Sequence, residues 1–257
     1  MITTASYLTL AGSPHGKQPQ YSALERAKAA SAAGIPAIGV LWNEPLTPKI
    51  LRYADVTEVE WFELTGPPGV AEFRAMRDLS EYYGCELIKT GLCDKRTSPD
   101  LAADSLAKVA RMAHHFGMTT AVEPVAWGAL PSMGDVKGIM EDAGVLEEPN
   151  VGYCYDLWQV AMGTSFVEGM HRGIFPVGKI AKVEVSGIGS ELHRDLITSA
   201  MDRPLITSSD VNVRAWVQRL RDQGFTGPVT LEEPNEHLRS LPLMKMAKLA
   251  AEEMSLF

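Results

Sequence analysis

Acidic residues recur where segments typical of β-strands come to an end. Glu123 lies in AVEPVAW, Asp156 in YCYDLWQ, Glu184 in KVEVSG and Glu232 in VTLEEPN. A buried carboxylate is unfavourable unless it is paired or bound to a metal, and four together repel one another unless protons or a cation compensate them. Ligation by oxygen alone favours a hard divalent ion such as Mg²⁺ or Mn²⁺. The four acids predict a metal site if folding brings these strand ends together.

The alternation of side chains along a strand selects which acids face the same way. Successive residues of a strand point to opposite faces, so Glu184 shares a face with Lys182, away from the intervening valines. By the same parity Glu232 shares a face with Thr230, which favours Glu232 over Glu233 as the ligand. Any one of these acids alone could equally be a helix N-cap or the partner of a lysine.

The elements that must position these acids alternate between strand and helix. Strand patterns cover residues 6–12, 36–42, 57–66, 85–91, 118–124, 150–156, 178–187 and 227–234. Helical patterns cover residues 22–35, 69–83, 98–116, 134–144, 158–173, 210–223 and 236–254, with a short piece at 48–54. Eight such units in one chain predict an α/β protein, a single (β/α)₈ TIM barrel over residues 1–257, whose chemistry lies at the C-terminal ends of the strands. The rival open doubly wound sheet lacks its GxGxxG after the first strand.

The composition limits the classes of molecule that the protein is expected to bind. The 257 residues carry a formal charge of −8, which argues against binding nucleic acid, because phosphate backbones require clustered cations. No apolar stretch reaches the ~18 residues that span a bilayer, so we expect no membrane association. The N-terminal segment lacks the pattern of a signal peptide, and the three cysteines are widely spaced without a CxxC pair. We therefore expect a cytoplasmic protein.

Several short motifs carry a resemblance to a known family. They are VEP at 122–124, Asp156, DRP at 202–204 and GFTGPVTLEE at 224–233. In this order they resemble the xylose-isomerase-like TIM barrel superfamily, which includes sugar-phosphate isomerases and epimerases. The resemblance implies a metal held by Glu, Asp, His and Glu on strands five to eight, which places Glu184 where relatives commonly have histidine. An all-carboxylate set, similar to that of xylose isomerases, makes Mn²⁺ or Mg²⁺ the expected ion rather than zinc.

Further residues are expected to face the substrate. They are Gln159, Arg203, Lys89, Trp127, His193 and His15. Many relatives have a histidine where this chain has Gln159, which can donate a hydrogen bond but cannot titrate, so the resemblance implies an unusual substrate. Each residue also has a structural alternative: Arg203 could bind Asp202, Lys89 could pair with one of the acids, and Trp127 could pack between barrel and helix. The two histidines could be uninvolved surface residues.

The resemblance implies a divalent-metal-dependent isomerase or epimerase of a sugar or related hydroxy-carbonyl compound. In relatives a carboxylate removes a proton next to a carbonyl to give a metal-stabilised enediolate, and Glu123 and Glu232 would be the acid/base pair. One alternative is a lyase or dehydratase acting on a cyclic keto acid, an inositol derivative or a C-glycoside at the same site. A second is a non-catalytic barrel subunit of a hetero-oligomer. A small-molecule substrate is expected, and both a homo-oligomer and a homologous partner subunit stay open.

Overall fold

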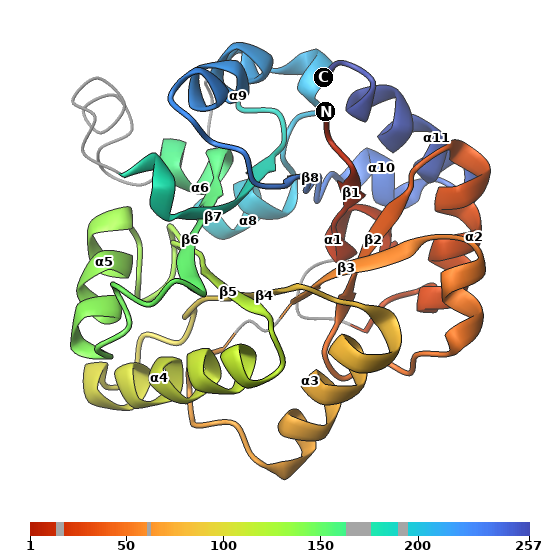
Figure 1. Ribbon diagram of the computed structural model, residues 1–257. Helices are drawn as coiled ribbons and strands as arrows, with labels where there is room; N and C mark the ends of the chain where they lie inside the picture. Colours follow the sequence, from red (N-terminus) through yellow and green to blue (C-terminus); the bar gives the residue numbers. More distant parts are fainter. Residues whose placement is uncertain (14–17, 61–62, 163–175, 190–194) are drawn as a thin grey trace.

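Eight parallel strands close into a barrel in the computed structural model, which describes residues 1–13, 18–60, 63–162, 176–189 and 195–257. The strands are Thr4–Ala5 (β1), Ala37–Leu41 (β2), Asp55–Glu60 (β3), Leu87–Thr90 (β4), Thr119–Val122 (β5), Val151–Asp156 (β6), Ile180–Val185 (β7) and Val229–Leu231 (β8). Each strand pairs with the next in chain order, and β1 pairs with β8 to close the ring (Figure 1). The predicted (β/α)₈ TIM barrel is confirmed.

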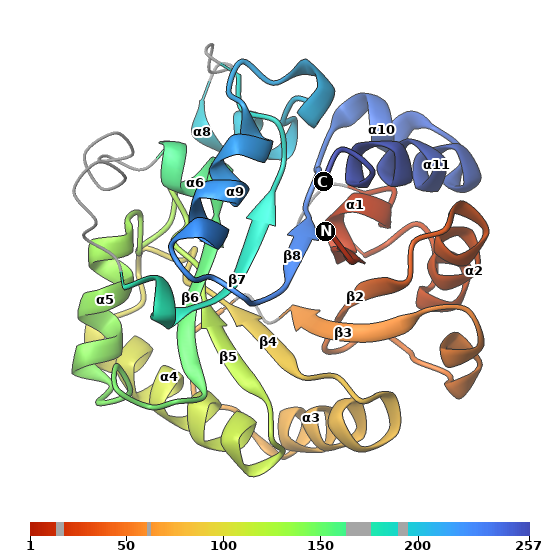
Figure 2. The same cartoon turned by 45° about the horizontal axis from the view of Figure 1, so that its top comes forward.

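Helices surround the strands on the outside of the ring (Figures 1 and 2). The described α-helices are Tyr7–Leu10 (α1), Ala23–Ala33 (α2), Val70–Tyr83 (α3), Pro99–His115 (α4), Met133–Asp142 (α5), Leu157–Met162 (α6), Leu196–Met201 (α8), Val213–Asp222 (α9), Glu236–Ser240 (α10) and Leu243–Met254 (α11). Short 3₁₀ turns cover Pro48–Arg52 (η1), Val177–Lys179 (η2) and Ile206–Ser208 (η3). In the described part of the chain, no helix combines the length and the apolar character needed to cross a membrane.

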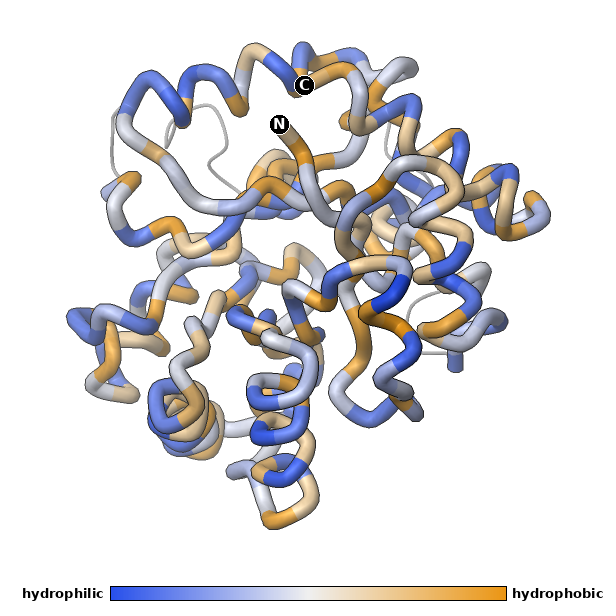
Figure 3. Tube along the Cα trace, turned by 45° about the vertical axis from the view of Figure 1, so that its right-hand side comes forward, coloured by the Kyte–Doolittle hydropathy of each residue, from blue (hydrophilic) through white to orange (hydrophobic). Residues whose placement is uncertain are grey.

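Local sequence signals begin and end these helices. Ser22 and Glu25 form a reciprocal capping box that satisfies free backbone N–H groups at the start of α2. Gly34 ends the same helix in the left-handed conformation, at φ 83°, which favours glycine. Hydrophobic and hydrophilic residues alternate along the outer helices, as Figure 3 shows, so each helix can turn an apolar face to the barrel.

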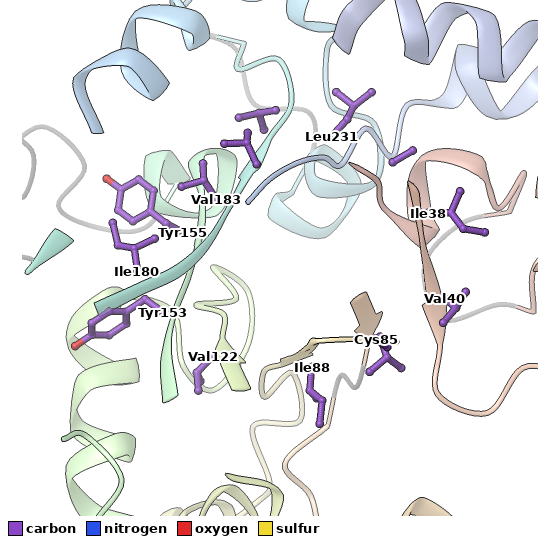
Figure 4. Close-up of a cluster of buried hydrophobic side chains, with 14 of the residues drawn as sticks. Ile38, Val40, Cys85, Ile88, Val122, Tyr153, Tyr155, Ile180, Val183 and Leu231 are labelled. Atoms are coloured by element: carbon purple, nitrogen blue, oxygen red, sulfur yellow. The ribbon is translucent and has the colours of Figure 1, made fainter. Parts of the chain in front are cut away.

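The two faces of the strands differ in chemistry. Apolar side chains such as Ile88, Val122 and Val183 point outward to the helices and form the main core (Figure 4). The inward positions of β3, β4 and β7 instead carry charged residues, including Lys89 and Glu184, both 0 % exposed. This alternation confirms the predicted parity of the seventh strand. The interior of the barrel is therefore a charged core enclosed by an apolar one.

The prediction of a strand over residues 6–12 is wrong. The first strand is only Thr4–Ala5, and the chain then turns into α1, whose Thr9 hydroxyl donates to the Leu231 carbonyl at 2.8 Å. Ser6 N–H bonds to the same carbonyl at 2.9 Å and ends the strand pairing with β8. The apolar residues of 6–12 are buried, but they are buried as a helical turn over the barrel mouth, which composition alone does not distinguish from a strand.

Candidate active site

The four predicted acids converge at one end of the barrel. Glu123 follows β5, Asp156 ends β6, Glu184 lies in β7, and Glu232 follows β8. Each is at most 2 % exposed, and one ligand atom from each lies within 4.8 Å of the others. Because parallel neighbouring strands end at the same level, the register that pairs Asp156 with Glu184 also aligns their carboxyl groups. The site predicted from the strand ends is therefore assembled.

Glu233 points away from this cluster, although it is also buried. Its Oε1 accepts a hydrogen bond from the Ile206 backbone N–H at 3.1 Å, on the helix-facing side of β8. Glu232 joins the four-acid cluster instead. The parity with Thr230 thus predicted which of the two adjacent glutamates joins the acid cluster.

Lys89 occupies the middle of the cluster. Its strand, β4, stands opposite β8 in the ring (Figure 1). Its ammonium nitrogen lies 2.5 Å from Glu232 Oε1, 3.0 Å from Glu184 Oε1 and 3.7 Å from Glu123 Oε2. Lys89 is fully buried, so its charge is stabilised by these carboxylates and not by water. Of the two expectations for Lys89, the structure favours pairing with the acids.

Arg203 compensates a second side of the cluster. Its guanidinium donates to Asp156 Oδ2 at 2.9 Å and lies 3.3 Å from Glu232 Oε2. It stacks over the Trp158 ring at 4.9 Å, a geometry that favours a cation. The structural alternative, in which Arg203 binds the adjacent Asp202, is therefore wrong.

A third cation supports the cluster from within the barrel. Lys182 donates to Glu184 Oε1 at 2.7 Å and to Glu58 Oε2 at 2.5 Å. Thr230 completes the same group with a hydrogen bond to Glu58 at 3.0 Å. This inner network fixes the Glu184 carboxylate in place, because Lys182 donates to Oε1 and Lys89 donates to Oε2 at 3.2 Å.

The interior is more acidic than basic. The described residues place six carboxyl groups and three cationic groups inside the barrel: Glu58, Glu60, Glu123, Asp156, Glu184 and Glu232 against Lys89, Lys182 and Arg203. With every carboxyl group ionised, six acids less three bases leave an excess of three negative charges, which protons on Glu60 and Glu123 or a bound cation would lower. A divalent cation would reduce that excess to one.

Burial and nearby charges divide the carboxyl groups into two kinds. Burial raises the pKa of Glu123 well above its ordinary value and that of Asp156 to about 6, in spite of the cations beside them. Burial acts on Glu184 in the same direction, but Lys182 and Lys89 outweigh it and hold that pKa at about 2. The cluster therefore contains a firmly ionised member and members that keep a proton more readily.

The donor set fits a hard divalent cation. The four groups are all carboxylates, and their mutual spacing of up to 4.8 Å is close to the ~4.2 Å that separates oxygens on opposite sides of a Mg²⁺ ion. The excess of negative charge points the same way. The Lys89 ammonium lies among these oxygens, where such an ion would compete with it.

A small pocket opens onto the cluster. Its lining is Leu8, Cys93, Glu123, Val125, Trp127, Gln159, Met201, Arg203 and Glu232. Of the four acids, only Glu123 and Glu232 are in this lining. Gln159 accepts the Ala126 backbone N–H through Oε1 at 3.0 Å, which leaves its amide NH₂ as the group that can donate to a ligand.

The structure describes four of the six residues that were predicted to face the substrate. Gln159, Arg203 and Trp127 line the pocket, and Lys89 lies just beneath it. His15 and His193 lie outside the described residues. Sequence reasoning missed Glu60, a buried inward residue of β3, although its alternation with Glu58 in the segment TEVE is the signal that could have found both.

Comparison with known proteins identifies a matching family and several similar structures. The family model described as xylose isomerase-like TIM barrel matches residues 63–257. No curated protein matches the sequence. Among solved structures, the IolI protein with a bound zinc atom has a TM-score of 0.77 at 13 % identity, covering 99 % of this chain and 96 % of that one.

Two further structures extend the comparison. A probable 3-DHS dehydratase, AsbF, from Bacillus anthracis has a TM-score of 0.68 at 12 % identity, with 100 % and 98 % of the two chains covered. A xylose isomerase-like TIM barrel protein from Mycobacterium smegmatis in complex with magnesium has a TM-score of 0.68 at 12 % identity, with 99 % and 95 % covered. At these identities the likeness concerns the fold alone.

Proposed function

The chain belongs to the xylose isomerase-like TIM barrel family, and from that premise we propose that it is a divalent-metal-dependent isomerase or epimerase. Its substrate would be a sugar or a related hydroxy-carbonyl compound. Mn²⁺ or Mg²⁺ would be held by Glu123, Asp156, Glu184 and Glu232, because these donors are all hard oxygens. Bound there, such a cation would supply Lewis-acid polarisation of a carbonyl.

The exposure of two acids to the pocket carries this proposal. Glu123 and Glu232 line the pocket, whereas Asp156 and Glu184 do not. Asp156 is held by Arg203 and by backbone N–H groups, and Glu184 by the two buried lysines. Their place in the pocket lining supports proton exchange with a ligand by Glu123 and Glu232, although Lys89 and Arg203 also hold Glu232 in the metal-free arrangement. Asp156 and Glu184, which are outside the lining, would serve to hold the cation.

The chemistry of the chain's own groups follows from this division. Glu232 would remove the proton on the carbon next to the carbonyl, and Glu123 would return a proton at the neighbouring carbon or at the opposite face. The NH₂ group of Gln159 would orient a hydroxyl or carbonyl oxygen. Trp127 and the apolar lining would exclude water from the carbanion and accept an apolar face of the substrate.

Solvent isotope exchange tests the proposal. The protein, loaded with Mn²⁺ or Mg²⁺, is incubated with a panel of hydroxy-ketones in D₂O, and deuterium uptake at carbon is followed by NMR and mass spectrometry. Glu232→Gln should lower exchange by about 10²- to 10⁴-fold, because an amide cannot act as a base. Glu233→Gln is the matched control: the adjacent residue is equally buried but faces the helices, so exchange should persist.

The same experiment separates the alternatives. Loss of water or of another β-leaving group after proton removal would identify a lyase or dehydratase, the reaction class of the structural neighbour AsbF, a probable 3-DHS dehydratase. An absence of exchange and turnover with metal bound would instead favour the non-catalytic subunit, and a search for a homologous partner chain would follow.

A further inference from the structure

Glu60 is a buried carboxyl group whose position the proposed reaction does not explain. It is 0 % exposed, and neither of its oxygens has a hydrogen-bond partner among the described residues. A buried polar group without a partner is costly, and a carboxyl group especially so. Glu60 does not line the pocket, so it does not contact a substrate there.

The cation beside Glu60 is Lys89, which also contacts the four-acid cluster. Glu60 pairs with Lys89 in the register of β3 and β4, so the two side chains stand side by side inside the barrel. The Lys89 nitrogen lies 3.8 Å from Glu60 Oε1, beyond hydrogen-bond distance, while it bonds to Glu232 at 2.5 Å. Lys89 therefore lies between Glu60 and the four-acid cluster, and in this arrangement it hydrogen-bonds to the cluster and not to Glu60.

The place of Lys89 is also where a metal ion would be bound. A divalent cation contacting Glu232, Glu184 and Glu123 would meet the ammonium group that now contacts Glu232 and Glu184. Like charges in a site without water repel strongly, so the two cations would not share these oxygens. The four-carbon side chain of lysine is flexible, and a shift of about 1 Å would bring Nζ from 3.8 Å to the ~2.8 Å of a charge-assisted hydrogen bond with Glu60.

We propose that Lys89 is an internal cation with two positions: it neutralises the four-acid cluster while no metal is bound, and it moves to Glu60 when a divalent cation enters. This inference rests on the metal site of the proposed function and describes how that site is regulated. Glu60 is then the receiving group for the displaced ammonium. Its lack of a partner in the metal-free arrangement is the expected state of such a group.

Metal affinity in a double-mutant cycle tests the inference. Mn²⁺ binding is measured by isothermal titration calorimetry for the wild-type protein, Lys89→Met, Glu60→Gln and the double variant. Lys89→Met removes the competitor and should tighten binding by about tenfold or more, while Glu60→Gln removes the receiving group and should weaken it by about tenfold. In the Lys89→Met background, Glu60→Gln should change the affinity by less than about threefold, because no ammonium needs a new position.

Glu58→Gln is the control for loss of charge. Glu58 lies two residues earlier on the same face of β3 and is equally buried, but its partner is Lys182. The two-position arrangement would be overturned if Glu60→Gln changed the Mn²⁺ affinity equally in the wild-type and Lys89→Met backgrounds. It would also be overturned if Glu58→Gln weakened binding as much as Glu60→Gln and depended on Lys89 to the same extent. An absence of Mn²⁺ binding in both the wild-type protein and Lys89→Met would overturn it as well.

A crystal structure of the wild-type protein with Mn²⁺ decides the matter even if Lys89→Met does not fold. The expected result is Nζ within hydrogen-bond distance of Glu60 and no longer bonded to Glu232. A metal ion bound with Nζ unmoved would refute the inference. Solvent isotope exchange reports proton transfer to the substrate, whereas the crystal structure and the affinities report where the Lys89 ammonium lies. Absence of exchange with Nζ moved to Glu60 would refute the proposed function alone, and exchange with Nζ unmoved would refute this inference alone.

Discussion

The buried Glu60 gives a prediction whose magnitude follows from the structure. Burial raises its pKa from an ordinary value of 4.5 to about 8, with Lys89 offsetting part of the effect. The folded protein therefore keeps this proton up to about pH 8, while the unfolded chain releases it near pH 4.5. Unfolding is then favoured as the pH rises through this window, and the loss of stability is complete above about pH 8.

Glu60→Gln replaces the carboxyl with a neutral group of the same size. The two pKa values of Glu60 differ by roughly 3.5 pH units, and each unit is worth about 1.4 kcal/mol for one proton. The unfolding free energy of the variant should therefore exceed that of the wild-type protein by up to about 5 kcal/mol at pH 8 and should equal it at pH 4.5. Residual water penetration makes this an upper bound. The measurement is urea denaturation at a series of pH values in EDTA, with the difference in unfolding free energy plotted against pH.

Glu58→Gln provides the contrast on the same strand. The Glu58 carboxylate is hydrogen-bonded to Lys182, so Glu58→Gln leaves a buried cation with a weaker partner and should lower the unfolding free energy by about 3 kcal/mol. At pH 8 this destabilisation is opposite in sign to the effect of Glu60→Gln. A stability difference for Glu60→Gln that is independent of pH between 4.5 and 8, or negative at pH 8, would refute the reasoning. Glu60 would then be an ionised and well-paired residue in the folded protein.

Three further outcomes follow from the packing. Arg203→Met should destabilise the metal-free protein by about 3–5 kcal/mol in urea denaturation, because it leaves the buried Asp156 without its cation; an unchanged midpoint would contradict this. Gly187→Ala should cost about 3 kcal/mol or more, since its Cβ would lie 2.3 Å from the Leu205 carbonyl oxygen, and a change below 1 kcal/mol would show that the loop adapts. Burial raises the pKa of Cys93 to about 12, so its thiol should react with Ellman's reagent at pH 8 much more slowly in the folded protein than after unfolding, and equal rates would contradict this.

Local sequence patterns were sufficient for the architecture. The alternation of strand and helix segments predicted the closed barrel, and side-chain parity within one strand placed Lys182 and Glu184 inside it. The predicted helical segments 22–35 and 98–116 begin at Ser22 and Ser98, which are the N-caps of α2 and α4. These features are readable because each depends on neighbours in the chain. Residues 6–12 were misassigned because a buried helical turn and a short strand have the same composition.

The sequence by itself determined that four acids would end adjacent strands and that they would need a cation. Only the tertiary structure decided which cation is near them. Lys89, in β4, and Glu232, just after β8, are 143 residues apart on opposite sides of the ring. Their side chains make contact across the barrel interior, so the contact depends on closure of the ring and not on any local pattern. The unpartnered state of Glu60 is likewise a property of the packed interior. Electrostatic interactions act through space, and the distances that govern them exist only after the chain has folded.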